Sequence, residues 1–191
     1  MKIESSKIQF QKIDDHVKLI YHNGKPIQFW TPELRVPFGI DENFGKYYLR
    51  LEIHQETKQH EMLKKILEKV ESVIVKRFQL EEQELKSIFR RKIGDHDLLD
   101  VRLKEIKGHN QTTCEYENTR DNYLKTIFDI EKGSYVKVFL EIHGVWDYRE
   151  GNENTKKEKD NRVGLIVNAL KVKVLDKKED LRNNYQDFII G

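Results

Sequence analysis

Cysteine is almost absent from the sequence: Cys114 is the only one among 191 residues. A single thiol cannot form an internal disulfide, and it cannot supply a zinc site that is built on several thiolates. The histidines also lack the His-x-x-x-His spacing of helical zinc sites. Asp95-His96-Asp97 offers metal-ligating side chains, but a turn after Gly94 favours the same polar residues. The sequence therefore predicts no bound metal and no cofactor.

Long apolar runs are also missing. No segment approaches the roughly 18–20 apolar residues of a membrane span. The chain carries charges from Lys2 and Glu4 onward and has no apolar core of a signal peptide. We therefore expect no membrane association and an intracellular location, in the cytoplasm or the nucleus, or at a viral replication site if the source is viral.

The chain has little net charge of either sign. The formal net charge is +2, although charged residues make up 36% of the chain. A near-neutral total argues against a protein that coats duplex nucleic acid with a wholly basic domain. A near-neutral net charge is still compatible with a local basic groove, because a partner responds to the local potential and not to the total charge. The apolar residues cluster in periodic segments, which indicates a folded domain with a heavily charged surface.

Alternating apolar and polar residues predict β-strands along most of the chain. Asn23-Gly24 is a strong hairpin signal, whereas two prolines and a glycine make residues 31–40 an extended loop or an edge segment. In the last strand the alternation places Ile166 and Leu170 inward. The expected strands are residues 6–13, 16–22, 26–30, 46–54, 98–106, 112–117, 123–130, 134–148 and 164–175.

One segment has a helical period instead. Between Thr57 and Phe78 apolar residues recur at steps of three and four, which predicts an amphipathic helix docked on the sheet. Thr57 is a plausible N-cap. A shorter helical piece is expected within residues 80–90.

These elements predict a fold class of β-rich α+β, an antiparallel OB-like barrel with one long inserted amphipathic helix. Other small α+β folds fit the same pattern. We expect residues 1–176 to form this single domain, with a charged loop at 149–163. Residues 177–191 are expected to form a polar C-terminal tail.

The outward faces of the predicted strands carry aromatic residues beside lysine and arginine. Such a surface can stack bases and neutralise phosphates, which is what binding of a single strand requires. The alternative for Tyr135 and Phe139 is a place in the core beneath the helix. The residues predicted to face outward are Trp30, Tyr48, Arg50, Arg102, Lys104, Tyr135, Lys137, Phe139, Lys171 and Lys173.

Catalytic patterns are weak in this chain. Glu105-Ile106-Lys107, with Asp97 or Asp100 upstream, has the Asp…Glu-x-Lys order of metal-dependent nucleases. Glu-x-Lys triplets are, however, expected by chance in a chain so rich in both residues. Cys114 with His109 nearby is more often an incidental thiol than a nucleophile. We therefore expect a protein that is not an enzyme, with a metal-dependent nuclease as the less favoured alternative.

Two stretches of the sequence resemble a known family. The first comprises residues 30–40 and 44–51, with the order Thr-Pro…Pro-Phe-Gly-Ile…Gly-Lys-Tyr-Tyr-Leu. The second comprises residues 133–146 and continues at Gly164-Leu165 with a Lys-Val-Lys strand. Together they are similar to the predicted single-stranded-DNA-binding proteins of nucleocytoplasmic large DNA viruses, which are distantly similar to podophage replication single-strand-binding proteins. The resemblance implies an OB-type barrel and non-catalytic, sequence-independent binding of single-stranded DNA in replication, repair or recombination.

The chain departs from that family at two places. Ile166 and Val167 stand where its members usually carry an aromatic residue. The acidic tail that recruits replication partners in the phage proteins is echoed only by Asp187-Phe188. The expected partners are single-stranded DNA, or RNA as an alternative, with replication proteins and a second copy of the chain as further candidates. A protein-interaction or virion component without nucleic-acid affinity is the rival function.

The predicted binding residues divide by role. Trp30, Tyr48, Tyr135 and Phe139 would stack on bases. Phe38 and Trp146 belong to the family signature and could be either platform or core, but strand parity puts Trp146 on the core side unless Gly144 bulges the strand. The cations expected to contact phosphates are Arg35, Lys46, Arg50, Arg102, Lys104, Lys137, Lys171 and Lys173.

Overall fold

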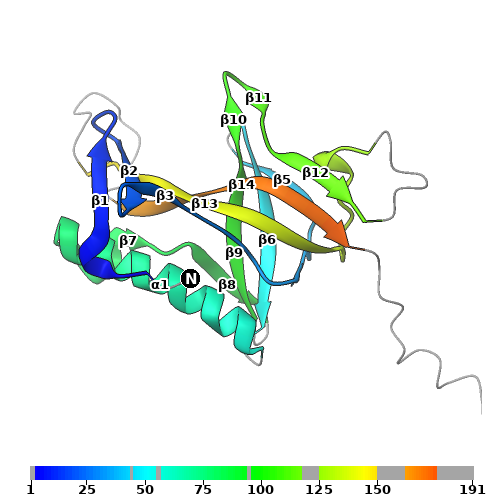
Figure 1. Cartoon of the computed structure of the whole chain (residues 1–191), viewed down its shortest axis with the longest axis horizontal. Helices are drawn as coiled ribbons and strands as arrows, with labels where there is room; N and C mark the ends of the chain where they lie inside the picture. Colours follow the sequence, from blue (N-terminus) through cyan, green and yellow to red (C-terminus); the bar gives the residue numbers. More distant parts are fainter. Residues whose placement is uncertain are drawn as a thin grey trace, which may run out of the picture.

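The computed structural model describes residues 3–43, 45–54, 57–93, 96–117, 125–149 and 162–175. This part of the chain is mostly β-sheet with one α-helix (Figure 1). Most of the charged loop expected at 149–163 and the whole tail expected at 177–191 lie outside the described residues. No helix within the described ranges is long and apolar enough to cross a membrane.

The described residues form the following elements, given in chain order. The first half contains η1 (Ser5–Lys7), β1 (Ile8–Lys12), β2 (Val17–His22), β3 (Lys25–Trp30), β4 (Leu34–Arg35), β5 (Ile40–Asn43), β6 (Lys46–His54) and α1 (Lys58–Phe78). The second half contains η2 (Glu82–Glu84), β7 (Leu85–Lys86), β8 (Phe89–Ile93), β9 (His96–Leu103), β10 (Glu105–Ile106), β11 (His109–Asn110), β12 (Thr113–Tyr116), η3 (Ile127–Asp129), β13 (Tyr135–Asp147) and β14 (Val163–Leu175).

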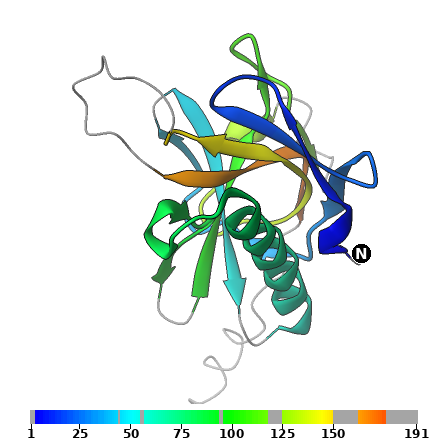
Figure 2. The same cartoon turned by 90° about the vertical axis from the view of Figure 1, so that its left-hand side faces the viewer.

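Five of the strands pair in a closed cycle. β13 pairs with β4, β4 with β6, β6 with β9, β9 with β14, and β14 returns to β13. Only the β9–β14 pair in this cycle is parallel. β1, β2 and β3 extend the sheet beside β13 (Figures 1 and 2). The apolar side chains that the cycle encloses are fully buried, among them Leu49, Leu51, Leu99, Val101 and Val136.

The β2–β3 connection is the hairpin that the sequence predicts. Asn23 and Gly24 have φ angles of 53° and 71°. Positive φ at both central residues is the requirement of a two-residue type I′ turn, whose twist matches that of the strands it joins. The turn brings β3 next to β13, where Trp30 pairs with Phe139.

The helix α1 occupies the predicted segment. Thr57 is its N-cap residue, but the hydroxyl group makes no capping hydrogen bond. At the other end Phe78 meets Phe10 of β1 edge-on, with ring centroids 5.4 Å apart. The helix therefore lies beside the first strands of the chain (Figure 2). Its buried apolar residues recur at steps of three and four: Leu63, Leu67, Val70 and Ile74.

Two expected elements are wrong. The helical piece expected at 80–90 is only the 3-10 turn η2, after which the chain enters β7 and β8 and pairs with β14 and β9. In place of the strand expected at 123–130, the described residues 125–130 contain the turn η3. Thr126 stabilises this turn, because its hydroxyl accepts a hydrogen bond from the Phe128 N–H and its own N–H donates to the Asp129 carboxylate. Residues 123 and 124 lie outside the described ranges.

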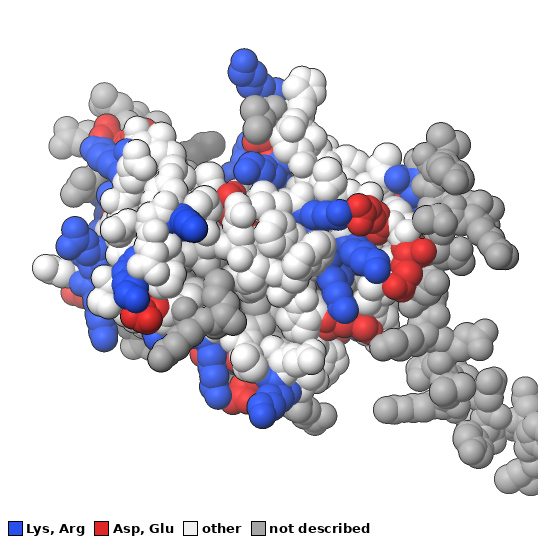
Figure 3. Space-filling view, viewed as in Figure 1, with Lys and Arg blue, Asp and Glu red and all other residues white. Residues whose placement is uncertain are grey.

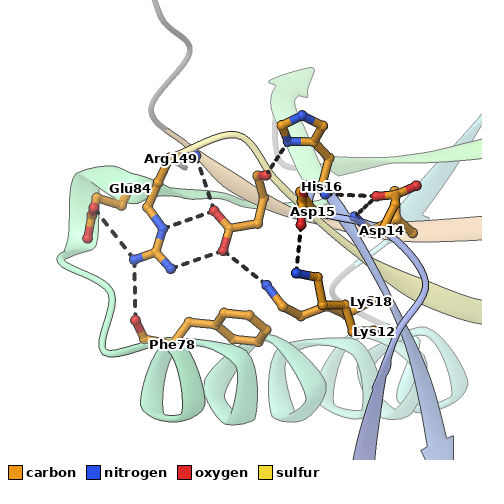
Figure 4. A network of polar contacts seen from close by, with 10 residues as sticks. Lys12, Asp14, Asp15, His16, Lys18, Phe78, Glu84 and Arg149 are labelled. Atoms are coloured by element: carbon orange, nitrogen blue, oxygen red, sulfur yellow. Dashed lines mark hydrogen bonds and ion pairs between the residues drawn. The ribbon is translucent and has the colours of Figure 1, made fainter. Parts of the chain in front are cut away.

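A buried carboxylate joins the end of β13 to the end of α1 (Figure 4). Asp147 is 4% exposed. Arg149 donates to its two oxygens from Nε and Nη2, at 3.0 and 3.1 Å, and Lys18 Nζ lies 3.5 Å from Oδ2. Arg149 Nη1 also donates to the carbonyl oxygen of Phe78 at 3.3 Å, so it caps the C-terminus of the helix. Burial by itself would raise the pKa of Asp147, but the hydrogen bonds and charges of Arg149 and Lys18 outweigh it and lower this pKa.

Candidate nucleic-acid interface

A pocket of about 430 Å³ opens between the outward faces of β6, β9 and the ends of β13 and β14. Three aromatic side chains line it: Tyr48, Trp146 and Tyr148. Three cationic side chains line it as well: Lys46, Lys86 and Arg102. Aromatic rings surrounded by cations are the arrangement that holds a base by stacking and its phosphate by charge. Of these six residues, the sequence predicts Lys46, Tyr48 and Arg102.

Trp146 reaches the pocket because β13 is irregular. The register with β14 shifts between Ile142 and Gly144, so the inward side passes from Ile142 to Val145. Trp146 is consequently half-buried on the outward side, with its ring 5.3 Å from that of Tyr148. The parity prediction that puts it in the core is wrong, and the bulge at Gly144 is the reason.

Gly144 itself is required at this bulge. A Cβ atom on it would lie 2.5 Å from the carbonyl oxygen of Lys18 in β2. Real Cβ atoms do not approach backbone that closely, so any side chain here must push β2 away from β13. The sequence signal for the bulge is therefore a glycine in the middle of a long apolar strand.

The neighbouring strand β14 has a glycine where the indole of Trp146 packs against it. A Cβ on Gly164, which pairs with Trp146, would lie 2.3 Å from the Cζ2 atom of the ring. The indole thus lies directly on the β14 backbone. Ile166 is half-buried and lines the same pocket, whereas its neighbours Leu165 and Val167 are buried, so the prediction that Ile166 faces the core is wrong. The reason is a register shift in β14: Ala169 and Lys171 pair with consecutive residues of β13, so Leu170 is an extra residue. The side chains on either side of this shift therefore alternate in the opposite sense.

Gly164→Ala should therefore displace the Trp146 ring. We expect a loss of about 1–2 kcal/mol in the free energy of unfolding, the usual cost of overpacking, and weaker binding of any base stacked on the indole. Urea unfolding followed by tryptophan fluorescence measures the first effect, and a changed native emission reports the displaced ring. Unchanged stability and emission would contradict the placement of the indole on Gly164.

The three cations that line the pocket differ in the groups they contact. Lys86 Nζ lies 5.7 Å from the centroid of the Trp146 ring, a cation–π contact. Lys46 is paired with Glu105 at 3.2 Å. Arg102 has a buried Nε atom without a hydrogen-bond partner among the described residues. An unsatisfied guanidinium nitrogen is costly, and an anionic oxygen is the group that would satisfy it.

A second group of predicted residues lies farther along the outward face of β13. We call it the Trp30 face; it consists of Trp30, Tyr135, Lys137, Phe139, Lys171 and Lys173. The Trp30 and Phe139 rings are 5.4 Å apart, and Trp30 is 48% and Tyr135 38% exposed. The alternative that α1 covers Tyr135 and buries it in the core is therefore wrong.

Most lysines of this face have a carboxylate partner. Lys171 pairs with Glu115, and Lys173 pairs with Glu117 at 3.3 Å. Lys137, which is exposed and lies opposite Lys173, has no ion pair among the described residues. Figure 3 shows the same mixture on the face it presents, where lysine and arginine side chains lie beside acidic ones and form no single basic field. The aromatic rings distinguish this face more than its charge does.

Glu141 lies on β13 between the pocket and the Trp30 face. It contacts His143 Nδ1 at 3.2 Å, accepts from Gln28 Nε2 at 3.0 Å, and lies 3.5 Å from Lys104 Nζ. A row of cross-strand pairs connects Glu141 to the pocket: Glu141 pairs with Asn168 of β14, and Asn168 pairs with Arg102 of β9. The hydrogen bond with His143 is the main cause that lowers the pKa of Glu141 to about 2, against the effect of burial.

This carboxylate should make the fold sensitive to acid. A folded-state pKa of about 2, below the ordinary value of 4.5, means that its contribution to stability is complete above about pH 4.5. The contribution is lost as the pH falls toward 2. Melting temperatures measured from pH 6 to pH 2 should therefore fall more steeply for the wild type than for Glu141→Gln. Parallel curves for the two proteins would contradict this role of Glu141.

The remaining predicted residues lie outside both groups. Phe38 is exposed and lies 5.9 Å below the Arg50 guanidinium, and Arg50 also pairs with Asp41 and Asp100. Arg35 is paired with Glu52 at 3.1 Å. The predicted set is thus divided between a pocket, the Trp30 face and separate ion pairs. Tyr148 and Lys86 also line the pocket but are not among the predicted binding residues, and for Trp146 the sequence allows either a platform or the core, with strand parity favouring the core.

The nuclease alternative gains no geometric support. Asp97 is bound by Lys64, Asp100 by Arg50 and Glu105 by Lys46. These three carboxylates do not form a metal-holding group in the described part of the chain. Burial raises the pKa of Cys114 to about 11, so its thiol stays protonated and is a poor nucleophile at neutral pH.

Comparisons with known proteins give distant structural similarities. No family model and no curated protein sequence matches the chain. One similar solved structure is gp2.5, a single-stranded DNA binding protein encoded by bacteriophage T7, with a TM-score of 0.48 and 10% identity over 87% of this chain and 98% of that one. Another is a C-terminal truncation of the single-stranded DNA-binding protein from bacteriophage Enc34, with a TM-score of 0.47 and 13% identity over 92% and 99% of the two chains. Because both TM-scores lie below 0.5, we base the functional assignment on the residues of this chain.

Proposed function

We propose that the protein binds single-stranded DNA without sequence preference and without catalysis, through the pocket that contains Trp146. The observation that carries this proposal is the convergence of Tyr48, Trp146 and Tyr148 with Lys46, Lys86 and Arg102 in one pocket. Every base has a π-face, so stacking on such rings tolerates any sequence. The near-neutral net charge of the chain disfavours coating of a duplex.

The path of the strand follows the outward face of β13. One base stacks on Trp146 between Tyr48 and Tyr148, and the phosphate beside it approaches Arg102 and Lys86. The strand then passes Glu141, whose charge Lys104 offsets, and reaches Trp30 and Phe139. About seven residues of β13 separate Trp146 from Phe139, or roughly 23 Å at about 3.3 Å per residue. A single strand of several nucleotides spans that length, in keeping with the site sizes of about 4–16 nucleotides that one OB-type domain covers.

This function fits an OB-like barrel, which we propose for the closed cycle of β13, β4, β6, β9 and β14. The roles in replication, repair or recombination follow from the resemblance to viral single-stranded-DNA-binding proteins and are part of the same proposal. Trp30 and Tyr135 are exposed in this chain, so the aromatic surface that a single strand needs is accessible. The same exposure is compatible with a protein partner at the Trp30 face. The binding experiment below distinguishes this alternative from binding of single-stranded DNA.

Fluorescence anisotropy of a labelled oligo-dT of about 16 nucleotides tests the proposal. We expect tight binding of the single strand and weak binding of a duplex of the same length, with an affinity for the single strand that falls linearly with the logarithm of salt concentration. An oligo-rU of equal length measures the preference for DNA over RNA. Absence of binding to either strand at low salt would overturn the proposal and favour a protein-interaction role.

A further inference from the structure

Two histidines and a glutamate from different strands meet at the end of β6. His54 pairs across the sheet with His96 of β9, and their ring centroids lie 3.9 Å apart. Glu52 is two residues before His54 on the same side of β6, with its Oε2 3.6 Å from His54 Nε2. One ligand atom from each of the three residues lies within 4.8 Å of the others. A tetrahedral zinc ion binds nitrogen and carboxylate oxygen at about 2.0–2.2 Å, so its ligand atoms lie roughly 3.3–3.6 Å from one another. The three side chains therefore need to close around the ion only by about 1 Å.

We propose that Glu52, His54 and His96 bind one zinc ion. Imidazole and carboxylate are a ligand set that suits zinc, whereas magnesium and calcium prefer oxygen ligands alone. Three protein ligands leave a fourth position for water. Of the run Asp95-His96-Asp97, His96 belongs to this cluster, whereas Asp97 is bound by Lys64 of α1 and Asp95 lies outside the described residues.

Two features of the surroundings support the site. The Nδ1 atom of His96 is buried and has no hydrogen-bond partner among the described residues. An unpaired buried nitrogen is costly, and a metal ion is one group that satisfies it. The end of β6 is also held in place, because His60 Nδ1 accepts the N–H of His54 at 3.1 Å while its Nε2 donates to the Glu33 carbonyl oxygen at 2.8 Å. Both nitrogens of His60 are used, so it positions His54 and is not a ligand.

Arg35 opposes the metal and limits its affinity. Its Nη1 lies 3.1 Å from Oε2 of Glu52, where it already neutralises the carboxylate. The Arg35 side chain is 39% exposed and can turn into solvent, but the ion must displace it. Zinc at this position would link β6 to β9 beside the start of α1 (Figure 1). It lies apart from the residues that line the pocket, so the two proposals are independent.

Isothermal titration of the full chain, first treated with a chelator, tests the site with Zn²⁺ and with Mg²⁺ as the comparison. We expect one Zn²⁺ per chain, no Mg²⁺ binding, and a higher melting temperature with Zn²⁺ present. His96→Gln should weaken Zn²⁺ binding by at least about tenfold and abolish the rise in melting temperature. His109→Gln is the matched control, because that exposed histidine of β11 is not in the cluster, and it should bind as the wild type does.

Two outcomes overturn the proposal. One is the absence of stoichiometric Zn²⁺ binding by the wild type. The other is His96→Gln binding Zn²⁺ as tightly as the wild type, which would assign any binding to other histidines. His54→Gln is the second ligand variant, used if His96→Gln does not fold by circular dichroism, and it should lose Zn²⁺ to the same extent. None of these measurements involves DNA, so they stand whether or not the chain binds a single strand.

Discussion

Trp146→Ala should weaken binding of single-stranded DNA by about 10- to 100-fold, the largest effect expected of any single substitution in the pocket. Stacking of one base on an aromatic ring is worth about 1–3 kcal/mol, and each 1.4 kcal/mol is about a factor of ten in affinity. The indole lies on Gly164, between Tyr148 and the Lys86 cation, so its face is fixed before DNA arrives. Anisotropy titrations of the variant at constant salt measure the loss.

Two further variants separate stacking from folding. Trp146→Phe keeps an aromatic face and should lose only about threefold, since most of the stacking area remains. Phe128→Ala removes an exposed ring that lies against Tyr47, away from the pocket, and should bind as the wild type does. The slope of affinity against salt should stay nearly constant in all three, because no phosphate contact is removed. Equal losses in Trp146→Ala and Phe128→Ala would show that the pocket is not the binding site.

Asp147→Asn should destabilise the protein by about 3 kcal/mol, the expected cost of removing one partner of a buried ion pair. The substitution keeps the size of the side chain but removes the carboxylate that Arg149 and Lys18 share, although Arg149 keeps its longer contact of 3.8 Å with Glu84 (Figure 4). Arg149 is then less firmly held against the Phe78 carbonyl, so the end of α1 should loosen as well. The free energy of unfolding in urea, followed by circular dichroism, measures the effect.

A neighbouring ion pair provides the control. Lys12 and Asp15 are 2.6 Å apart, but their side chains are 62% and 81% exposed. Asp15→Asn should therefore change the free energy of unfolding by less than about 0.5 kcal/mol. The Asp147→Asn effect should also shrink in acid, because the lowered pKa of Asp147 means that its contribution is lost as the pH falls through that value. Similar effects of the two substitutions at neutral pH would contradict the role of Asp147 as the link between β13 and α1.

The geometry also explains why a chain with almost no net charge can bind an anion. Several predicted phosphate contacts are already paired with carboxylates, among them Lys46, Lys171 and Lys173. The Glu115 and Glu117 side chains are exposed, so a phosphate can exchange for them at small cost. Glu105 is only 8% exposed, so it holds Lys46 more firmly. Arg102 Nε and Lys137 have no carboxylate partner among the described residues, so a phosphate can bind them without displacing one. Affinity should accordingly depend on the aromatic rings more than on the number of cations.

Most of the helices and strands could be predicted from the sequence, because their signals are local. Alternation identified β6, β9 and β13, where the inward residues Leu49, Leu99 and Val136 are fully buried. Steps of three and four identified α1 to within one residue. Asn23-Gly24 identified the hairpin because positive φ is cheap for these two residues. Each signal depends only on neighbouring residues and on the period of one element.

Which side chains share a site could not be predicted in this way, because it depends on how the strands are aligned with one another. The bulge at Gly144 moves Trp146 from the core side to the pocket, and the shift at Leu170 turns Ile166 outward. The pairing of β6 with β9 brings His54 against His96, 42 positions apart in the sequence. Register between strands is set by the packing of the whole sheet, and one extra residue reverses every side chain after it. A periodic sequence therefore predicts the strands, whereas the pocket and the proposed zinc site follow from how those strands are aligned.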